Sequence, residues 1–356
     1  MSAVFHFPAE LNEVPLLKED VDRHRSSSKH ELIVILTKDN PTRLLRTLPY
    51  YERFSRDVIL IDDSTTELTR RLVVSKFRRS VSYHGRAEQT RLLRRLGLHH
   101  SRFTSPLGKV GWTLGFCRNY AVLLSLALGA DLLLMVDDDI IIEDKRTVDM
   151  SFRLLGQYAV VGTRTVGMYD DSIIGHLARR LGEVQYDYIT GQYAGLNLHS
   201  INYYFPNVYN EDLIFYAFQG QGKEFARSGT VRQLTKKTIG NFDSTLMFQE
   251  EGEILLIGAI EATTRGNESL LLQSDFWSVI LRDRIEELCE LAKLQTQHGV
   301  DSSSHPFNVL TKYHSRLQPA SFVSFYRKYR RSIEPWRTIL TKANNRKIEV
   351  EPIAHI

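Results

Sequence analysis

Asp131-Leu-Leu-Leu-Met-Val-Asp137-Asp138-Asp139-Ile-Ile-Ile-Glu143 is an apolar run interrupted by three consecutive carboxylates. A short run of bulky apolar residues is typical of a buried parallel strand. Along an extended backbone Asp137 and Asp139 point to the same side, so we expect this pair to converge on one cation. Carboxylate oxygens suit Mg²⁺ or Mn²⁺ and do not select zinc. The alternative is a solvated acidic turn, which we rank second because open α/β sheets bind ligands at this edge.

Composition sets broad limits. The chain has 356 residues, enough for roughly two domains or one large α/β domain with an appendage. Hydrophobic residues make up 42% and charged residues 25%, which excludes a wholly disordered chain. The net charge of +4 fits an anionic substrate without identifying nucleic acid. Cys117 and Cys289 form neither a disulfide framework nor a zinc site, so we expect a reducing, cytoplasmic location. We expect no signal peptide, and the most apolar window, residues 121–136, is too short to span a bilayer.

Two strand–helix units precede this stretch. Leu32–Leu36 is predicted as a strand, and Asn40-Pro41 is predicted to start a helix with Asn40 as its N-cap. Val58–Ile61 is a second predicted strand that ends in Asp62-Asp63-Ser64. Ser64–Glu67 then fits a capping box. Strand, helix, strand, helix over so short a span predicts parallel strands joined by right-handed crossovers, and hence an α/β fold.

Basic residues gather after the second unit. Residues 70–102 contain nine arginines, one lysine (Lys76) and the single acid Glu88. A solvated helical face explains most such runs, and we prefer it to a surface for nucleic acid or an anionic membrane, because aromatic residues are not interleaved. Further on, Arg118 is predicted at the start of a helix that is closed by Gly129 at its C′ position. There Arg118 would either bind phosphate or form an exposed salt bridge.

The second half of the chain mixes glycines, aromatic residues and a late acidic pair. Ile189–Leu198 is rich in glycines, which let backbone approach a ligand closely. The aromatic run Asn202–Asn210 is either core packing or a sugar platform, and its Asn and Pro residues favour an exposed loop. Glu211-Asp212 supplies either first-turn acids of a helix or a general base. Beyond these, Ile254–Ile260 is predicted as a strand and Leu270–Gln297 as an amphipathic helix.

In this order the motifs resemble those of family-2-like glycosyltransferases with the GT-A fold, in the nucleotide-diphospho-sugar transferase superfamily. The matching pieces are Thr37-Lys-Asp39-Asn, Asp62-Asp63-Ser64, Arg118-Asn119, Asp137-Asp138-Asp139 as the DxD motif, Gly191–Gly195 and Asn210-Glu211-Asp212. The resemblance covers residues 31 to about 235. It implies a Rossmann-like, mostly parallel sheet flanked by helices, with a helical C-terminal extension. We expect an N-terminal arm over residues 1–30, a catalytic domain over 31–250 and a basic, mainly helical extension over 251–356.

The resemblance also implies roles for particular residues. The donor would be a nucleotide-diphosphate sugar, bound by Thr37, Asp39, Asp62, Asp63, Arg118, Asp137, Asp138 and Gly191. Asp137 and Asp139 would hold Mn²⁺ or Mg²⁺, and His305, in a predicted loop, is the candidate for a third metal ligand, with His314 as another. Asp212 would deprotonate an acceptor hydroxyl with Glu211 in support, which predicts transfer with inversion.

Three alternatives remain open. A retaining transferase would share the fold, and analysis of the product anomer separates it from an inverting one. A sugar nucleotidylyltransferase would need a glycine-rich loop after the first strand, which Thr37–Pro41 lacks. A non-catalytic protein on the same scaffold would bind nucleic acid or a membrane through its basic segments. In a hybrid reading these segments guide the enzyme to an anionic polymer as acceptor.

Overall fold

A computed structural model describes residues 12–13, 29–54, 56–76, 81–98, 113–167, 189–219, 225–234, 247–297 and 305–345. The strands are β1 (Asn12–Glu13), β2 (Glu31–Thr37), β3 (Asp57–Asp62), β4 (Ser82–His84), β5 (Leu132–Asp137), β6 (Ile140–Ile141), β7 (Val160–Val166), β8 (Tyr193–Asn197) and β9 (Phe225–Gln233). Within the described ranges they form one nine-stranded sheet of order β1-β9-β7-β8-β5-β2-β3-β4, with β6 paired to β9. β2, β3, β4 and β5 are parallel neighbours, whereas β8 runs antiparallel to both β5 and β7. The predicted α/β fold with a mostly parallel sheet is confirmed.

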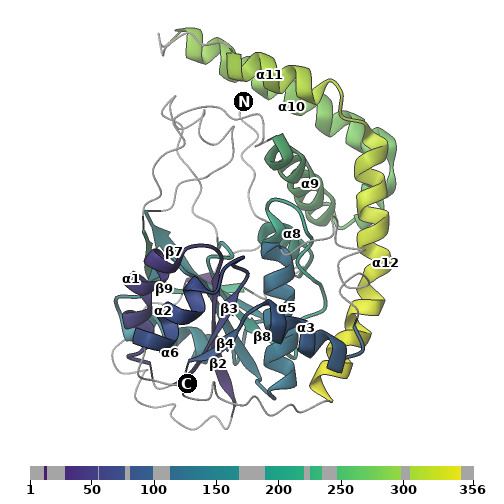
Figure 1. The fold of residues 1–356 in the computed structure, drawn as a ribbon. Coiled ribbons are helices and arrows are strands. Elements are labelled where there is room, and N and C mark those ends of the chain that lie inside the picture. Colours follow the sequence, from purple (N-terminus) through teal and green to yellow (C-terminus); the bar gives the residue numbers. More distant parts are fainter. Residues whose placement is uncertain are drawn as a thin grey trace.

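Helices cover both faces of this sheet (Figure 1). They are α1 (Pro41–Tyr51), α2 (Leu68–Lys76), α3 (Arg86–Arg95), α5 (Leu114–Ala127), α6 (Lys145–Leu154) and α8 (Glu211–Gln219). Side chains alternate along β2, so Val34 joins the core cluster on one face and Ile33 the cluster on the other. α1, α2 and α6 pack on the face of Ile33, and α3, α5 and α8 on the face of Val34. Burial on both faces explains why β2 and β5 are almost purely apolar.

The C-terminal part is a helical extension, as predicted. It consists of α9 (Met247–Thr264), the 3₁₀ helix η3 (Glu268–Leu272), α10 (Ser274–Gln297), α11 (His305–His314) and α12 (Pro319–Asn344). Figure 1 shows α12 running down beside the layer of α3 and α5, while α10 and α11 reach away from the sheet. Leu133 of β5 and Tyr326 of α12 belong to the same core cluster, so the extension shares its core with the sheet.

Two predictions about elements are wrong. Ile254–Ile260 is part of helix α9 and not a strand. α8, α10 and α12 surround this part of α9, so its residues are apolar all round and carry no helical periodicity. The aromatic run 202–210 is not an exposed platform either, since Tyr204 and Phe205 are buried. α12 holds the run in place, because the Tyr329 hydroxyl donates to the carbonyl of Tyr204 at 3.1 Å.

Helix ends follow the sequence with small departures. α1 begins at Pro41 as predicted, but the Asn40 side chain makes no capping hydrogen bond. α2 begins only at Leu68, and the hydroxyl of Ser64 accepts from the backbone N–H of Asp39 at 2.7 Å, outside any capping box. Gly129 follows α5 with φ 73°, the left-handed conformation predicted for a C′ glycine. The expected N-terminal arm lies almost wholly outside the described residues, as do residues 99–112.

Candidate functional site

The carboxyl ends of β2, β3 and β5 meet at one edge of the sheet. In the strand register Thr37 lies opposite Asp62, and Leu36 lies opposite Asp137. Parallel neighbours end together, so three motifs separated by up to a hundred positions become neighbours. The Thr37 hydroxyl donates to Asp138 Oδ2 at 2.6 Å, which joins the first motif to the acidic triplet directly.

The acidic triplet turns out of the sheet. β5 ends at Asp137, and Asp138 and Asp139 form a turn before β6. The expectation that Asp137 and Asp139 share a side by strand alternation is therefore wrong, because the backbone is no longer extended there. The turn is fixed from α1, where the Thr47 hydroxyl donates to the carbonyl oxygen of Asp138 at 2.8 Å and the Tyr51 hydroxyl to that of Ile140 at 2.8 Å.

Asp139 has partners that the sequence did not reveal. Its Oδ2 accepts from Arg43 Nη1 at 3.1 Å and from Gln233 Nε2 at 3.1 Å. Its Oδ1 is buried and has no hydrogen-bond partner among the residues that the structure describes. Arg43 lies in the first turn of α1, which starts at this edge of the sheet, so the sequence could have indicated it as a partner for the acidic triplet. Gln233 was not predictable, because it depends on the antiparallel pairing of β6 with β9.

The Asp137 and Asp139 carboxylates fit a divalent cation. Mg²⁺ commonly takes one or two protein carboxylates and completes its shell with water and substrate phosphates. The buried Oδ1 of Asp139, which has no hydrogen-bond partner among the described residues, and the 22% exposed side chain of Asp137 offer such oxygens. No cluster of three ligating side chains occurs within the described part of the chain. His305 belongs to α11, which Figure 1 places at the outer end of the extension, and its side chain lies outside the description.

The acidic pair after β3 is held by protein groups. Asp62 is 1% exposed, and its Oδ2 accepts from the Tyr83 hydroxyl at 2.7 Å. Asp63 is 2% exposed and pairs with Lys38 Nζ and with Arg86 Nη2, both at 3.1 Å. Asp62 and Asp63 therefore stabilise the loops at this edge, and the side chains of Lys38 and Arg86 beside Asp63 remain exposed to solvent.

Asp39 ties together the loops that follow β2 and β3. It has φ 50°, a conformation that Asp and Asn adopt more readily than most residues. Its Oδ1 accepts from the backbone N–H of Thr65 at 3.0 Å, and its own N–H donates to Ser64 Oγ at 2.7 Å. The predicted donor-binding residues Thr37, Asp39, Asp62 and Asp63 thus form one continuous rim.

Arg118 joins this rim to the late acidic pair. It lies one turn inside α5 and is 1% exposed, so neither the predicted helix start nor an exposed salt bridge describes it. Nε donates to Glu211 Oε1 at 3.1 Å, Nη1 donates to the carbonyl of Gly191, and Nη2 lies 3.6 Å from Asp137 Oδ1. Burial alone would lower the pKa of Arg118, but Asp137 and Glu211 raise it above its ordinary value. Arg118 is therefore a fixed positive charge between the two acidic motifs.

Gly191 is the other link between these motifs. Its backbone N–H donates to Asp212 Oδ2, and its carbonyl accepts from Arg118. A Cβ at this position would lie 2.6 Å from the Arg118 guanidinium carbon, so a larger residue would displace that side chain. Glycine was expected here to let the backbone approach a ligand, but the group that lies close to the backbone of Gly191 is the Arg118 guanidinium.

Glu211 and Asp212 differ in exposure. Burial, and then the neighbouring charge of Asp212, raise the pKa of Glu211 to about 7, and together they outweigh the opposing effect of Arg118. Glu211 is 6% exposed, whereas Asp212 is partly exposed. Of the two carboxylates, Asp212 is therefore the one that solvent reaches.

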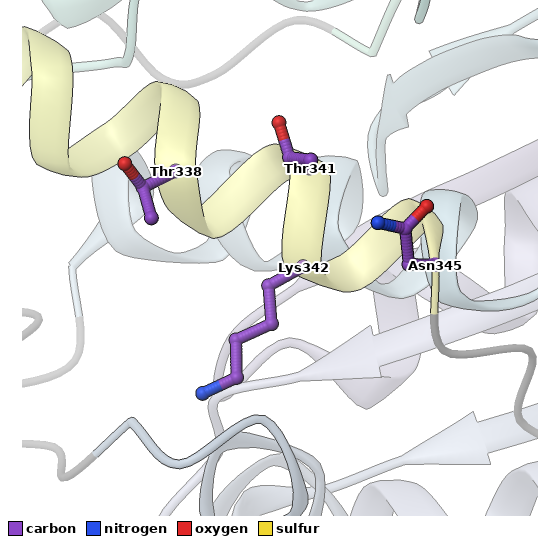
Figure 2. Close-up of a pocket in the computed structure, with 4 residues that line it drawn as sticks. All are labelled: Thr338, Thr341, Lys342 and Asn345. Carbon is purple, nitrogen blue, oxygen red and sulfur yellow. The ribbon is translucent and has the colours of Figure 1, made fainter.

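Elsewhere, a surface hollow lies at the end of α12 (Figure 2). It is lined by Thr338, Thr341, Lys342 and Asn345. Among these described lining residues Lys342 is the single charged one and none is a carboxylate, so they offer none of the acid–base chemistry of the sheet edge.

The sheet order and its acidic edge define a GT-A-like α/β fold. No family model and no curated protein matches the chain. Among solved structures, it is similar to a mannosyltransferase from Pyrobaculum calidifontis in complex with GDP-Man and Mn²⁺, at 10% identity over 90% of this chain and 88% of that one, with a TM-score of 0.45. It is also similar to Mycobacterium tuberculosis glucosyl-3-phosphoglycerate synthase, at 14% identity over 67% and 81% of the two chains, with a TM-score of 0.41. At such low sequence identity and TM-score, these similarities do not identify functional residues in this chain. Any functional conclusion must therefore come from the site itself.

Proposed function

We propose that this chain is a metal-dependent glycosyltransferase that moves a sugar from a nucleotide-diphosphate sugar to an acceptor hydroxyl. One observation carries the proposal: buried Arg118 connects Asp137 of the acidic triplet to Glu211 beside Asp212. A transferase of this kind needs a site for a charged leaving group and a base for the acceptor, set at a fixed separation. Arg118 and Gly191 supply that fixed separation.

The donor would lie along the rim formed by Thr37, Asp39, Asp62 and Asp63. Asp137 and Asp139 would hold Mn²⁺ or Mg²⁺, and the ion would neutralise charge on the departing diphosphate. Until it binds, Arg43 balances the charge of Asp139. Lys38 and Arg86 add positive charge beside Asp63, which favours an anionic donor.

Asp212 is the proposed general base. Its carboxylate is oriented by the backbone N–H groups of Gly191 and Leu213, and it is partly exposed. An acceptor hydroxyl must lose a proton as it attacks, which needs a carboxylate within hydrogen-bond reach. Glu211 accepts a hydrogen bond from Arg118 and would have a supporting role next to Asp212. Direct attack by an activated acceptor gives inversion, and the anomer of the product tests this against retention.

The first experiment uses a panel of nucleotide sugars without metal, with Mn²⁺ and with Mg²⁺. One donor should raise the apparent stability of the wild type only with metal, by on the order of 2.7 kcal/mol at a hundredfold excess over Kd. Asp139→Asn should abolish that shift. Asp212→Asn should keep it but lose slow release of nucleoside diphosphate to water. If no donor shifts the wild type with either metal, the proposal is wrong.

A second candidate role is binding to a polyanion. Arg327, Lys328, Arg330 and Arg331 are exposed on α12, and within the described residues none of them forms an ion pair. This surface would suit an anionic polymer, either as acceptor or as sole ligand. Binding to heparin and to single-stranded DNA should weaken steeply with salt if the surface is used, and charge reversal at Arg327 and Arg331 should remove it.

A further inference from the structure

The residue that leads into the acidic pair has an unusual backbone conformation. Asn210 has φ 60°, in the left-handed region that few residues other than glycine adopt. Its side-chain Nδ2 donates to Glu253 Oε1 at 2.9 Å. Glu253 lies on α9, beyond the part of the chain expected to carry the chemistry. The geometry of the turn before Glu211 and Asp212 is thus tied to the helical extension.

The neighbouring residues make the same connection through backbone. A Cβ on Gly252 would lie 2.5 Å from the carbonyl oxygen of Tyr209, so α9 can approach Tyr209 this closely only because residue 252 is glycine. Gly252 and Glu253 therefore contact two consecutive residues, Tyr209 and Asn210, one by packing and one by a hydrogen bond. α9 also packs along α8, the helix that begins with Glu211.

α9 is in turn fixed by the other helices of the extension. A Cβ on Gly258 would lie 2.1 Å from the ring of Trp277 in α10, and the Tyr326 hydroxyl of α12 donates to the carbonyl of Leu255 at 2.6 Å. Glu250, which is fully buried, accepts from Arg284 of α10 at 3.4 Å. Contacts on several sides leave α9 little freedom to shift, so it is a rigid reference for the turn at Asn210.

The other end of the same segment is held by α5. Asn119 exchanges two hydrogen bonds with the backbone of Phe205, at 2.7 and 2.9 Å. A Cβ on Gly115 would lie 2.5 Å from the carbonyl oxygen of Pro206. α5 also carries Arg118, which binds Glu211. The same helix therefore positions both Glu211 and the start of the segment that precedes it. The segment from Phe205 to Asn210 is therefore fixed at both ends.

We propose that Glu253, acting through Asn210, is a positioning residue for the Asp212 base. The inference rests on the proposed function, in which Asp212 accepts the proton of the acceptor. Thr37, Asp62 and Asp139 are held by Asp138, Tyr83 and Arg43 respectively. Losing Glu253 should therefore misplace the base and leave donor binding intact. The expected signature is a lower kcat with an unchanged donor KM.

The test measures nucleoside diphosphate release to water by the full-length chain, with UDP-glucose, UDP-galactose, UDP-N-acetylglucosamine and GDP-mannose as donors and Mn²⁺ present. Glu253→Ala should lower kcat by roughly tenfold to a hundredfold, with donor KM within about twofold of wild type. Glu253→Gln keeps an oxygen that can accept from Asn210 and should retain most of the rate. Asn210→Gly tolerates the backbone conformation but loses the amide, so it should match Glu253→Ala, and the two changes together should cost no more than either. Glu261→Gln removes an ion pair with Arg265 on the same helix and is the matched control.

Hydrogen exchange of the same variants gives a readout that is independent of turnover. Glu253→Ala should speed exchange in residues 205–213 and leave β2 and β5 unchanged. If the wild type releases nucleoside diphosphate and Glu253→Ala equals it in kcat, the positioning role is overturned while the proposed function stands. If the wild type releases none from any donor, the proposed function fails, and the positioning role of Glu253 fails with it. Equal exchange in wild type and Glu253→Ala overturns the contact itself.

Discussion

Arg118 has its guanidinium shared among Asp137, Gly191 and Glu211, with almost no exposure to solvent. Removing one partner from a buried ion pair leaves an uncompensated charge, which typically costs about 3–5 kcal/mol. We predict that Arg118→Met lowers the free energy of unfolding by that amount in urea denaturation. Arg118→Lys keeps the charge but loses the planar fork, so it should fall between wild type and Arg118→Met.

The control for this prediction is a double variant. In Arg118→Met with Glu211→Gln the buried carboxylate is neutralised as well, so the loss should be smaller than the sum of the two single losses. Strictly additive losses would contradict a direct interaction between Arg118 and Glu211.

Glu211 should give the protein a defined pH dependence. Its pKa is raised to about 7 by burial and then by Asp212, against an unfolded value near 4.5. The folded state then binds the proton more tightly than the unfolded state, so this contribution is fully present below the unfolded pKa and is lost as pH rises through about 7. The loss is on the order of 3 kcal/mol. Unfolding measured from pH 4.5 to 8 should show a slope in wild type that Glu211→Gln lacks, and equal slopes would contradict the assignment.

Single residues of the site were predictable where they end a strand. Thr37, Asp62 and Asp137 follow apolar runs, and parallel strands bring such ends together. Arg43 and Gln233, the partners of Asp139, depend on how α1 and β9 approach the turn. No local pattern encodes those approaches, and the same holds for Glu253 against Asn210.

Among elements, α9 and α10 are joined by one aromatic side chain. Trp277 is fully buried, with its ring stacked on Phe322 at 5.0 Å and on Tyr326 at 5.6 Å. It also fills the space that Gly258 leaves on α9. We predict that Trp277→Ala costs about 3–5 kcal/mol of unfolding free energy. Val279→Ala, two residues along the same helix but 45% exposed, should change it by no more than about 0.5 kcal/mol.

Elements at the sheet were easier to predict than those of the extension. Leu32–Leu36 and Leu132–Val136 are apolar runs of strand length with carboxylates or capping residues at their ends, which fixes their type. Ile254–Ile260 has the same composition but lies in a long helix. What distinguishes Ile254–Ile260 from the strands is that neighbouring helices bury α9 on all sides. That burial depends on tertiary packing and cannot be read from the local sequence.

For the molecule as a whole, the two expected domains share one core. A single cluster contains Leu133 of β5, Tyr120 of α5, Ile254 of α9 and Phe322 of α12. A continuous core makes independent unfolding of the extension unfavourable. We predict that in a Trp112→Phe variant, whose tryptophan fluorescence reports only on Trp277 and Trp336 in the extension, fluorescence and far-ultraviolet circular dichroism give coincident urea transitions. Two separated midpoints would show that the extension unfolds on its own.

The fixed ends of the segment from Phe205 to Asn210 have an evolutionary consequence. Surface loops normally accept insertions and deletions. Here an added residue would strain the hydrogen bonds that hold the two ends, Phe205 to Asn119 and Asn210 to Glu253. Among descendants of this chain we therefore expect the side chains of the segment to drift while its length stays constant. Any engineered insertion meant to enlarge the acceptor range belongs elsewhere.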